Sequence, residues 1–391
     1  MRPLVLTAAT VVSAIGRGVG PTLHALRSRR SALRPCDFGG ASGGYIGRVD
    51  GLESHRLPPS LACIDCRNNR LADLALHTDG FSDAVAAARD RYGADRIAVV
   101  LGTSTSGVLS GEAAYRARDP QTGALPSSFD YGSTQDMFSL AGFVRAALAL
   151  RGPAMVVSTA CASSARTFID ARHLIESNVC DAAIVGGTDS LCGMTLHGFA
   201  SLDLISRGAC RPCDADRSGI SIGEAAGFAL LERDGVGMAL MGCGTSSDGY
   251  HMSAPHPRAT GAIAAMRAAL EAGGLSAADI DYVNLHGTGT RANDAMEDIA
   301  MVDVFGTGTP CSSTKGWTGH SLGASGILEA VIAGLCIEHG FIPGCLNVTR
   351  LDPDFRARVI VDNEQRPIRR VMSNAFGFGG INCSLIFGTA S

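Results

Sequence analysis

The sequence predicts an α/β fold in which β-sheets are layered between helices. Short runs rich in β-branched residues alternate with Ala-rich stretches along the chain, which is the pattern of strands separated by helices. With 391 residues, of which 46% are hydrophobic and 18% charged, the chain can bury a large core. Its 49 glycines suit the many tight turns that this alternation requires.

The first predicted strand lies within residues 3–15, which are mostly apolar and precede a Gly-rich turn. This run also resembles a short signal peptide, because it follows a basic residue. Its Thr and Ser residues and its short length favour a buried strand, and no other stretch reaches the roughly 18 charge-free apolar residues of a membrane-spanning helix. Further strands are predicted at residues 96–101, 154–158, 182–185, 228–231, 280–285 and 371–374.

Helices are predicted between these strands, at residues 162–177, 260–272 and 321–337. A soft boundary lies at residues 233–235, after one strand and before a second Gly-rich opening at residues 241–249. We therefore expect two halves, residues 1–232 and 233–391. Each would begin with a strand and a Gly/Ser/Thr-rich turn, a pattern compatible with an internal duplication.

Charge and cysteine content limit the classes of partner. The 33 Lys and Arg residues against 37 Asp and Glu residues give a net charge of −4, so no global basic field holds nucleic acid or an anionic membrane. An acidic partner must find a local basic patch. The 13 cysteines fit a reducing cytoplasm where thiols stay free, since a chain of this length needs no disulfide staples. We expect a cytoplasmic protein.

Several familiar motifs are absent or lack their context. No complete dinucleotide fingerprint or phosphate-binding loop occurs. The serine-hydrolase pattern Gly-x-Ser-x-Gly occurs at residues 219–223 and 319–323. The first match lacks the strand-to-helix setting, and the second lacks an acid followed by a histidine downstream.

Two Cys-x-x-Cys pairs, at residues 63–66 and 210–213, have the spacing of zinc ligands. They are far apart in the chain, and a sequence with 13 cysteines produces such pairs by chance. We therefore interpret them as structural cysteines and predict no metal site.

Cys161 is the candidate nucleophile. Residues 154–158 are predicted to form a buried strand, residues 159–164 a sharp turn, and the following residues a helix, which places Cys161 at a helix N-terminus. Unpaired N–H groups and the positive end of the helix dipole favour the thiolate there. A cysteine between alanines is also typical of a small core residue. The strand-turn-helix setting favours the nucleophile.

Two histidines lie in loops of small residues. His286 follows a strand and opens a Gly/Thr-rich loop, and His320 stands at the start of a predicted helix. Small neighbours leave room for a substrate to approach the rings. Lys315 is either a buried cation or a solvated loop lysine, and Glu297 either pairs with it or faces water.

Together these segments resemble the elongating β-ketoacyl-acyl carrier protein (ACP) synthases, the ketosynthases of the thiolase superfamily. The matching blocks are STACASS at 158–164, RPCDADRSGISIGEAAG at 211–227, DGYHMSAP at 248–255, HGTGT at 286–290, SSTKGWTGH at 312–320 and SNAFGFGGINCSLIFG at 373–388. The resemblance implies a thiolase-type fold, with two similar α/β halves in a five-layer αβαβα sandwich that dimerises through the N-terminal half. Residues 67–70 and 96–107 are also similar to ketosynthases of aryl-polyene pathways.

The resemblance implies specific roles for the catalytic candidates. Cys161 is the acylated nucleophile, and His286 and His320 complete a Cys-His-His triad. Lys315 and Glu297 correspond to an accompanying buried charged pair. The backbone N–H groups of Cys161 and Phe378 correspond to the oxyanion hole.

The same resemblance implies substrate and carrier contacts. Thr288 and Thr290 correspond to positions that bind the phosphopantetheine arm, Phe378 to the gate of the acyl pocket, and Phe199 to a residue near the cysteine. Thr105 corresponds to a position that lines the acyl pocket. Arg67 and Arg70 match basic ACP-docking positions, whereas Asp203 replaces a basic contact of one subfamily. Residues 211–214 and 217–219 depart from the family's usual Arg-Pro-Phe-Asp and Arg-Asp-Gly.

The implied reaction is a decarboxylative Claisen condensation of an acyl-Cys161 enzyme with malonyl-ACP, in fatty acid or polyene chain elongation. No metal or redox cofactor is expected, since the malonyl carboxylate supplies the carbanion. The expected partners are ACP and a second subunit, either an identical copy or a non-catalytic chain-length partner, with no nucleic acid or membrane. A thiolase acting on coenzyme A substrates is the alternative. It needs a second catalytic cysteine, and Cys383 follows GFGGIN rather than preceding a thiolase-like Gly.

Overall fold

Two sets of five strands with the same spatial order form the frame of the protein. The computed structural model describes residues 2–40 and 43–389. In each set, the first strand along the chain lies beside the fifth, followed by the fourth, second and third. The N-terminal set is β1 (Leu4–Ser13), β9 (Ala225–Glu232), β7 (Ala182–Asp189), β5 (Ile97–Gly102) and β6 (Ala154–Val157). The C-terminal set is β10 (Met238–Ser247), β17 (Ile381–Thr389), β16 (Arg370–Phe376), β11 (Tyr282–Asn284) and β12 (Pro310–Ser312).

Strand direction repeats as well as strand order. The first strand and the fourth each pair antiparallel with the fifth, while the fourth, second and third run parallel to one another. The two sets meet where β1 pairs with β10, from Leu4↔Leu240 to Leu6↔Met238. We propose residues 1–232 and 233–391 as the two halves, because the turn between β9 and β10 separates the repeated sets.

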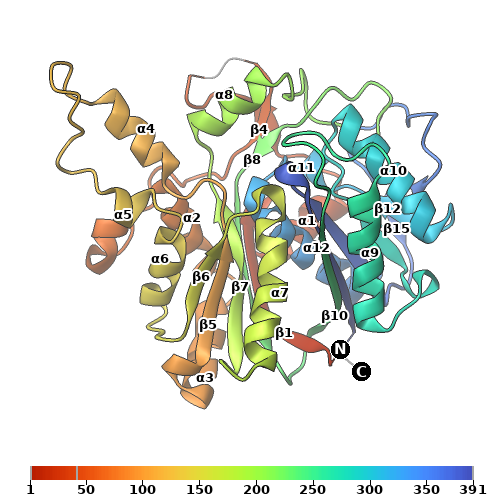
Figure 1. Cartoon of the computed structure of the whole chain (residues 1–391), viewed down its shortest axis with the longest axis horizontal. Coiled ribbons are helices and arrows are strands. Elements are labelled where there is room, and N and C mark those ends of the chain that lie inside the picture. The colour runs from red at the N-terminus through yellow and green to blue at the C-terminus, as the bar shows by residue number, and fades with distance from the viewer. Residues whose placement is uncertain (1, 41–42, 390–391) are drawn as a thin grey trace.

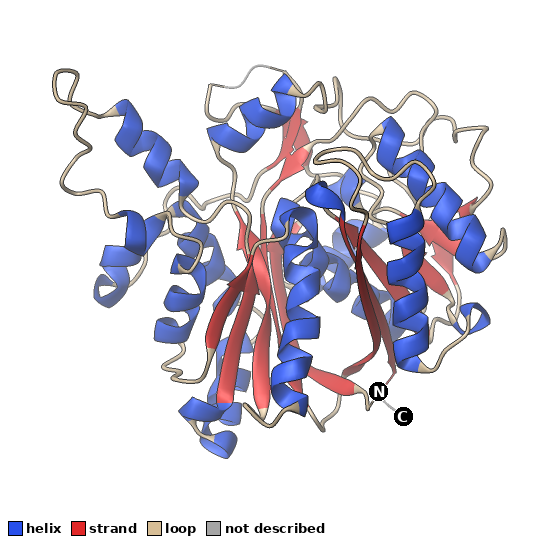
Figure 2. Ribbon diagram, viewed as in Figure 1, coloured by secondary structure: helices blue, strands red, loops and turns tan. Residues whose placement is uncertain are grey.

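Helices cover both outer faces of the frame and fill its centre. Helices α7 (Ser163–Glu176) and α12 (Ser325–His339) pack between the two strand sets, and their apolar side chains share one core cluster with residues of both. The outer layer of the N-terminal half consists of α2 (Arg67–Leu76), α3 (Phe81–Tyr92) and α6 (Ser139–Ala147). The opposite outer layer consists of α9 (Thr260–Gly273) and α10 (Arg291–Phe305). Figure 1 shows α6 and α9 on opposite sides of the strands and α7 between them, and Figure 2 shows the strands as two groups separated by helices. The predicted five-layer sandwich is confirmed.

The remaining elements connect or flank these layers. The helices are α1 (Val19–Arg27), α4 (Val108–Arg116), α5 (Tyr131–Thr134), α8 (Gly193–Ser201) and α11 (Lys315–Thr318). The strands are β2 (Gly16–Arg17), β3 (Leu33–Pro35), β4 (Tyr45–Gly47), β8 (Ile222–Gly223), β13 (Phe341–Ile342), β14 (Arg358–Val359) and β15 (Glu364–Gln365).

The two most apolar segments are core elements. Strand β1 is largely buried between β9 and β10, which confirms the predicted strand rather than a signal peptide. Residues Leu322–His339 are long and apolar enough to cross a bilayer, but 78% of that window is buried inside the protein, mostly as α12. A helix that is apolar on all sides suits this position, because sheet strands cover it on two sides.

The fold gathers the candidate site at one end of both strand sets. β6, β11 and β12 are parallel strands whose carboxyl ends lead to Cys161, His286 and, through α11, His320. In open α/β sheets this is the end at which ligands bind.

Candidate active site

Cys161 lies in a tight turn between β6 and α7. The turn is a short 3-10 helix at Ala160–Ala162, and α7 begins at Ser163 rather than at the predicted residue 162. Ala160 has φ of 50°, a left-handed conformation that is unfavourable for a residue with a side chain. The chain thereby turns sharply and directs the Cys161 side chain into a cavity, while only 5% of the residue remains exposed.

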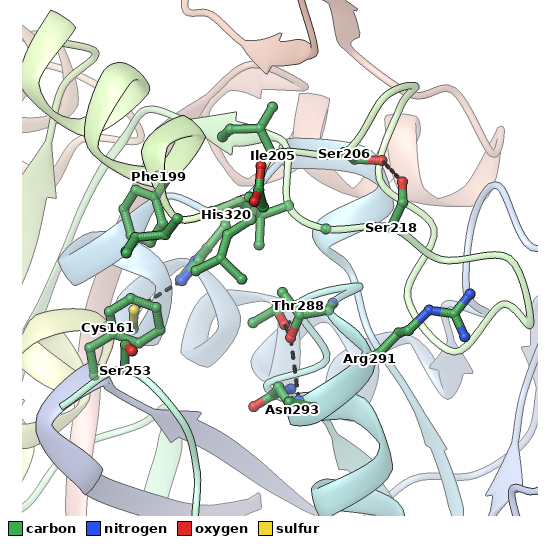
Figure 3. A pocket seen from close by; sticks show the side chains of 18 of the residues that line it. Cys161, Phe199, Ile205, Ser206, Ser218, Ser253, Thr288, Arg291, Asn293 and His320 are labelled. Carbon is green, nitrogen blue, oxygen red and sulfur yellow. Dashed lines mark hydrogen bonds between the residues drawn. The ribbon is translucent and has the colours of Figure 1, made fainter. Parts of the chain in front are cut away.

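His320 lies next to the thiol. Its Nε2 is 3.0 Å from Cys161 Sγ (Figure 3). Its Nδ1 is 3.0 Å from Ser325 Oγ. Its backbone is fixed as well, because His320 N–H donates to Ser221 O at 2.7 Å and its carbonyl accepts from Gly223 N–H at 2.9 Å. A serine hydroxyl can donate or accept, so it supports either neutral tautomer of the ring.

His286 completes the predicted triad. Its ring centroid lies 5.2 Å from that of His320, with the ring planes at 81°. The thiol sulfur of Cys161 and a ligating nitrogen of each ring all lie within 4.8 Å of one another. Within residues 2–40 and 43–389 this is the one group of three or more His, Cys, Asp or Glu side chains close enough to share an ion. The two Cys-x-x-Cys pairs therefore do not come together as a four-thiol group in the described part of the chain.

Burial keeps the triad uncharged. Desolvation lowers the pKa of both His286 and His320 well below the usual value, and the Lys315 ammonium lowers both further. Desolvation raises the pKa of the Cys161 thiol to about 11, against the opposing attraction of Lys315. The expectation that the helix N-terminus favours a thiolate is therefore wrong for the resting site, because burial outweighs it. At neutral pH a neutral thiol faces two neutral imidazoles.

Lys315 is the only lysine in a chain with 33 basic Lys and Arg residues, and it is 1% exposed. Its Nζ donates to His286 O and to Glu329 Oε1, each at 2.5 Å. The compact ammonium fits between these two acceptors, whereas a planar guanidinium demands more room. The predicted buried cation is therefore present, and it also holds the backbone of His286.

The predicted partner of Lys315 was wrong. Glu329, on α12, holds the lysine. Glu297 instead accepts hydrogen bonds from the backbone N–H groups of His286 and Gly287, each at 2.8 Å, and from Asn374 Nδ2 at 3.2 Å. Burial raises the pKa of Glu297 to about 7. One sequence signal could have identified Glu329, since it is the only charged residue between His320 and Glu338.

The triad opens into a cavity of about 1520 Å³. Phe199, on α8, and Phe378 line it with their ring centroids 5.5 Å apart, and Figure 3 shows Phe199 among the side chains of this cavity. Thr288 and Thr290 also line it, and their hydroxyl oxygens lie 2.9 Å apart. These four residues therefore lie where the resemblance places substrate contacts.

Two backbone N–H groups face the sulfur. Those of Phe378 and of Cys161 itself both favour the charged form of the Cys161 side chain by hydrogen bonding. The close approach depends on Gly377, since a Cβ there would lie 2.8 Å from Thr159 O. The N–H groups thus converge as an oxyanion hole requires.

Thr105 does not line this cavity. It is fully buried, and its hydroxyl and backbone N–H both donate to Asp189 Oδ1 at 2.8 Å. The expectation that Thr105 lines the acyl pocket is therefore wrong for this cavity, because its polar group is committed to a buried carboxylate.

The predicted docking arginines are already paired. Both Arg67 Nε and Nη2 donate to Glu224, at 2.9 and 2.7 Å, and Arg67 Nη1 donates to Glu53 at 2.7 Å. The Arg67 side chain is 9% exposed and that of Glu224 is 0% exposed. Arg70 makes a two-bond pair with Asp65. The prediction of an exposed, free Arg67 for docking is wrong, because a buried carboxylate holds it.

Comparison with known proteins agrees with this geometry. The family model for the beta-ketoacyl synthase N-terminal domain matches residues 70–235, and that for the beta-ketoacyl synthase C-terminal domain matches residues 238–349. Nodulation protein E of Rhizobium sp. (strain N33) is 31% identical over 99% of both chains. The 3-oxoacyl-[acyl-carrier-protein] synthase 2 of Rhizobium meliloti (strain 1021) is 36% identical over 74% of this chain and 73% of that protein. The structure of a ketosynthase (ApeO) in complex with its chain length factor (ApeC) from Xenorhabdus doucetiae superposes with a TM-score of 0.91 at 39% identity, covering 100% of this chain and 98% of that one.

Proposed function

Because the chain belongs to the β-ketoacyl synthase family, we propose that Cys161, His286 and His320 carry the reaction of that family here. The protein is an acyltransferase, a 3-oxoacyl-[acyl carrier protein] synthase that condenses an acyl group with malonyl-ACP. The observation that supports the residue assignment is the 3.0 Å separation of Cys161 Sγ and His320 Nε2 at the cavity.

The first step is acyl transfer to Cys161. His320 Nε2 accepts the thiol proton as sulfur attacks the thioester carbonyl, since the thiol is protonated at rest. The backbone N–H groups of Cys161 and Phe378 stabilise the tetrahedral oxyanion. The bond between carbonyl carbon and carrier sulfur then breaks, and His320 returns the proton to the departing thiolate.

The second step is decarboxylative condensation. Malonyl-ACP loses carbon dioxide, and the electron pair of the broken C–C bond forms an enolate. For this step His320 takes its Nε2–H tautomer, which the Ser325 hydroxyl supports by donating to Nδ1. The neutral imidazole N–H groups of His286 and His320 then donate to the enolate oxygen without protonating its carbon. The enolate carbon attacks the acyl-Cys161 carbonyl, the C–S bond breaks, and the Cys161 thiolate takes up one proton. These steps need no metal or redox cofactor, because the malonyl carboxylate supplies the electron pair.

The buried position of Cys383 argues against the thiolase alternative. It lies in β17, is 0% exposed, and does not contribute to the lining of the catalytic cavity. Burial raises the pKa of its thiol far above the usual range. A second catalytic cysteine is therefore not available at that position.

Two arginines at the cavity replace Arg67 and Arg70 in our account of carrier binding. Arg207 and Arg291 are exposed, line the same cavity as Cys161, and make no ion pair with a carboxylate of the described chain. Figure 3 shows Arg291 extending away from Thr288 and Asn293. Acyl carrier protein is an acidic partner that offers a phosphodiester on its prosthetic arm, and unpaired guanidinium groups suit both charges.

The second subunit is expected at the edge of the N-terminal half. β6 is an edge strand, and among the described residues it pairs only with β5. Nearby, α4 and α5 stand away from the layers in Figure 1 and carry the exposed aromatic residues Tyr115 and Tyr131. An unpaired strand edge beside apolar side chains suits pairing with a homologous subunit. A second copy of this chain fits that edge, and so does a chain-length partner like the one in the ApeO complex.

We propose an aryl-polyene-type pathway within the family, because residues 67–70 and 96–107 resemble ketosynthases of such pathways. The 13 free cysteines support a reducing, cytoplasmic location. The function is tested by incubating the chain, with and without a co-expressed chain-length partner, with acyl-ACP and malonyl-ACP. We expect β-ketoacyl-ACP extended by two carbons and an equal amount of carbon dioxide. Product from acyl-coenzyme A alone, without any carrier protein, would support the thiolase alternative instead.

A further inference from the structure

Asp189 is a buried carboxylate that the reaction steps above do not use. It ends β7 and is 0% exposed. Five donors point at it: Thr103 Oγ1 at 2.7 Å, Ser104 N, Thr105 N and Thr105 Oγ1 each at 2.8 Å, and Gly323 N at 2.6 Å. All five partners donate, which suits an acceptor-only carboxylate. Burial raises the pKa of Asp189, and the hydrogen bonds from Thr103, Ser104 and Thr105 oppose that rise.

These donors come from segments that carry the catalytic residues. Gly323 lies in the 3-10 turn Leu322–Ala324, directly after His320 in the C-terminal half. Ser104 lies in the loop after β5 in the N-terminal half, and its hydroxyl donates to Ala160 O at 3.2 Å. Ala160 immediately precedes Cys161. A chain of hydrogen bonds therefore runs from the turn after His320, through Asp189 and Ser104, to the turn that holds Cys161.

Both turns contain a strained residue. Ala160 has φ of 50° and Leu322 has φ of 51°. Left-handed backbone costs about 1 kcal/mol or more at a residue with a side chain, so surrounding contacts must hold it. Contact is close at Gly323, where a Cβ would lie 2.8 Å from both Asp189 Oδ2 and Ser104 Oγ. The Asp189 hydrogen bonds supply such contacts beside both turns.

We propose that Asp189 is a positioning residue that sets the distance between Cys161 Sγ and His320 Nε2 by holding the two catalytic turns against each other. It does not line the cavity and therefore touches no substrate. The inference rests on the proposed roles of Cys161 and His320. The condensation would then depend also on Asp189, a carboxylate at the junction of the two halves.

Asp189→Asn tests this role, because the amide keeps the shape but offers one acceptor oxygen and turns an NH₂ group toward N–H donors. We expect kcat to fall about 100-fold, as for a displacement of about 1 Å, with an unchanged KM for ACP. The negative charge of Asp189 also disfavours the Cys161 thiolate. Alkylation of Cys161 by iodoacetamide should therefore shift to lower pH in Asp189→Asn. The shift must occur at a native melting temperature, because unfolding would expose the buried thiol and also lower its pKa.

Asp181→Asn is the matched control. Asp181 immediately precedes β7, at the end opposite Asp189, and pairs with Arg96 at 2.8 Å. The same chemical change there should leave kcat and the alkylation profile unaltered. A folded Asp189→Asn enzyme with native kcat would overturn the proposal.

Two milder variants decide the matter if Asp189→Asn does not fold. Ser104→Ala removes the link to Ala160, and Thr103→Val removes one donor to Asp189. A lower kcat at a native melting temperature in Ser104→Ala supports the role, and native kcat in both variants overturns it. Failure of the wild-type protein to acylate Cys161 would instead reject the proposed function. Equal acylation and condensation rates in wild type and variants reject only the role of Asp189.

Discussion

His320 Nε2 lies 3.0 Å from Cys161 Sγ, although the two residues are 159 positions apart in the chain. Cys161 lies in the short turn Ala160–Ala162, and His320 lies between α11 and the turn Leu322–Ala324. Burial keeps the ring and the thiol neutral. In the proposed mechanism, proton transfer between them is therefore part of the acylation step and not a preliminary ionisation.

Replacing His320 by Ala should slow carbon dioxide release from malonyl-ACP. The variant loses one of two donors to the enolate oxygen, and loss of such a donor costs about 100-fold or more in rate. Decarboxylation is measured in single turnovers on pre-acylated enzyme, which separates this role from the proton transfer during acylation. Far-ultraviolet circular dichroism controls for folding, and an undiminished decarboxylation rate would contradict the role of His320.

The acid limb of the pH–activity profile should lie well below the ordinary histidine pKa of about 6.5. Burial lowers the pKa values of His286 and His320. Both rings therefore stay neutral, and able to serve in the proposed reaction, at pH values where an exposed histidine is half charged. The measurement is kcat as a function of pH. A limb centred near 6.5 would show that the rings are solvated.

The same lowered pKa values predict how stability depends on pH. In the unfolded chain both histidines bind protons below about 6.5, while in the folded protein they do not. The stability that they contribute is therefore present above this pH and is lost as the pH falls through 6.5 toward the lowered folded values. Urea unfolding of wild type and of the His286→Gln and His320→Gln variants should show a smaller pH slope in each variant.

Arg67→Ala should destabilise the protein rather than weaken carrier binding. It leaves the fully buried Glu224 without its two-bond partner, and uncompensated buried charge costs about 3 to 5 kcal/mol. Arg70→Ala breaks a more exposed pair and should cost less than about 1 kcal/mol. Chemical denaturation of the two variants gives the comparison. Equal stability of both would contradict the buried role of Arg67.

Arg207→Glu and Arg291→Glu should raise KM for malonyl-ACP more than they change kcat, because they reverse charge at the cavity without touching the triad. Arg369→Glu is the matched control. Arg369 is exposed and precedes β16 at the end of the sheet opposite the site. An equal rise of KM in Arg369→Glu would show that the effect comes from the net charge of the protein, and it would contradict carrier binding by Arg207 and Arg291.

The layered α/β elements and the candidate nucleophile could be predicted from local patterns, whereas the five-layer repeat and the Cys-His-His triad were implied by the resemblance to the ketosynthases. Strand runs such as residues 182–185 and small-residue turns around Cys161 are visible along the chain, and β7 and the Ala160–Ala162 turn occur there. The sequence pattern did not show which carboxylate pairs with Lys315. Both Glu297 and Glu329 stand within reach of Lys315 in sequence, and only the packing of α12 beside α11 decides between them.

Burial was the other property that local patterns could not supply. Arg67 and Arg70 share one helix and one residue type, yet one is held by the fully buried Glu224 and the other by the partly exposed Asp65. Thr105 similarly has a side chain of the size expected at a pocket wall but turns to Asp189, which is 84 positions away. The strength of desolvation at Cys161 likewise depends on both halves closing over it.

Intact-protein and peptide mass spectrometry after incubation with acyl-ACP tests the central claim most directly. We expect one acyl group per chain, located on the peptide that contains Cys161, and none on the Cys161→Ala variant. An acyl group of normal yield on that variant, or on a different residue of the wild-type chain, would contradict it.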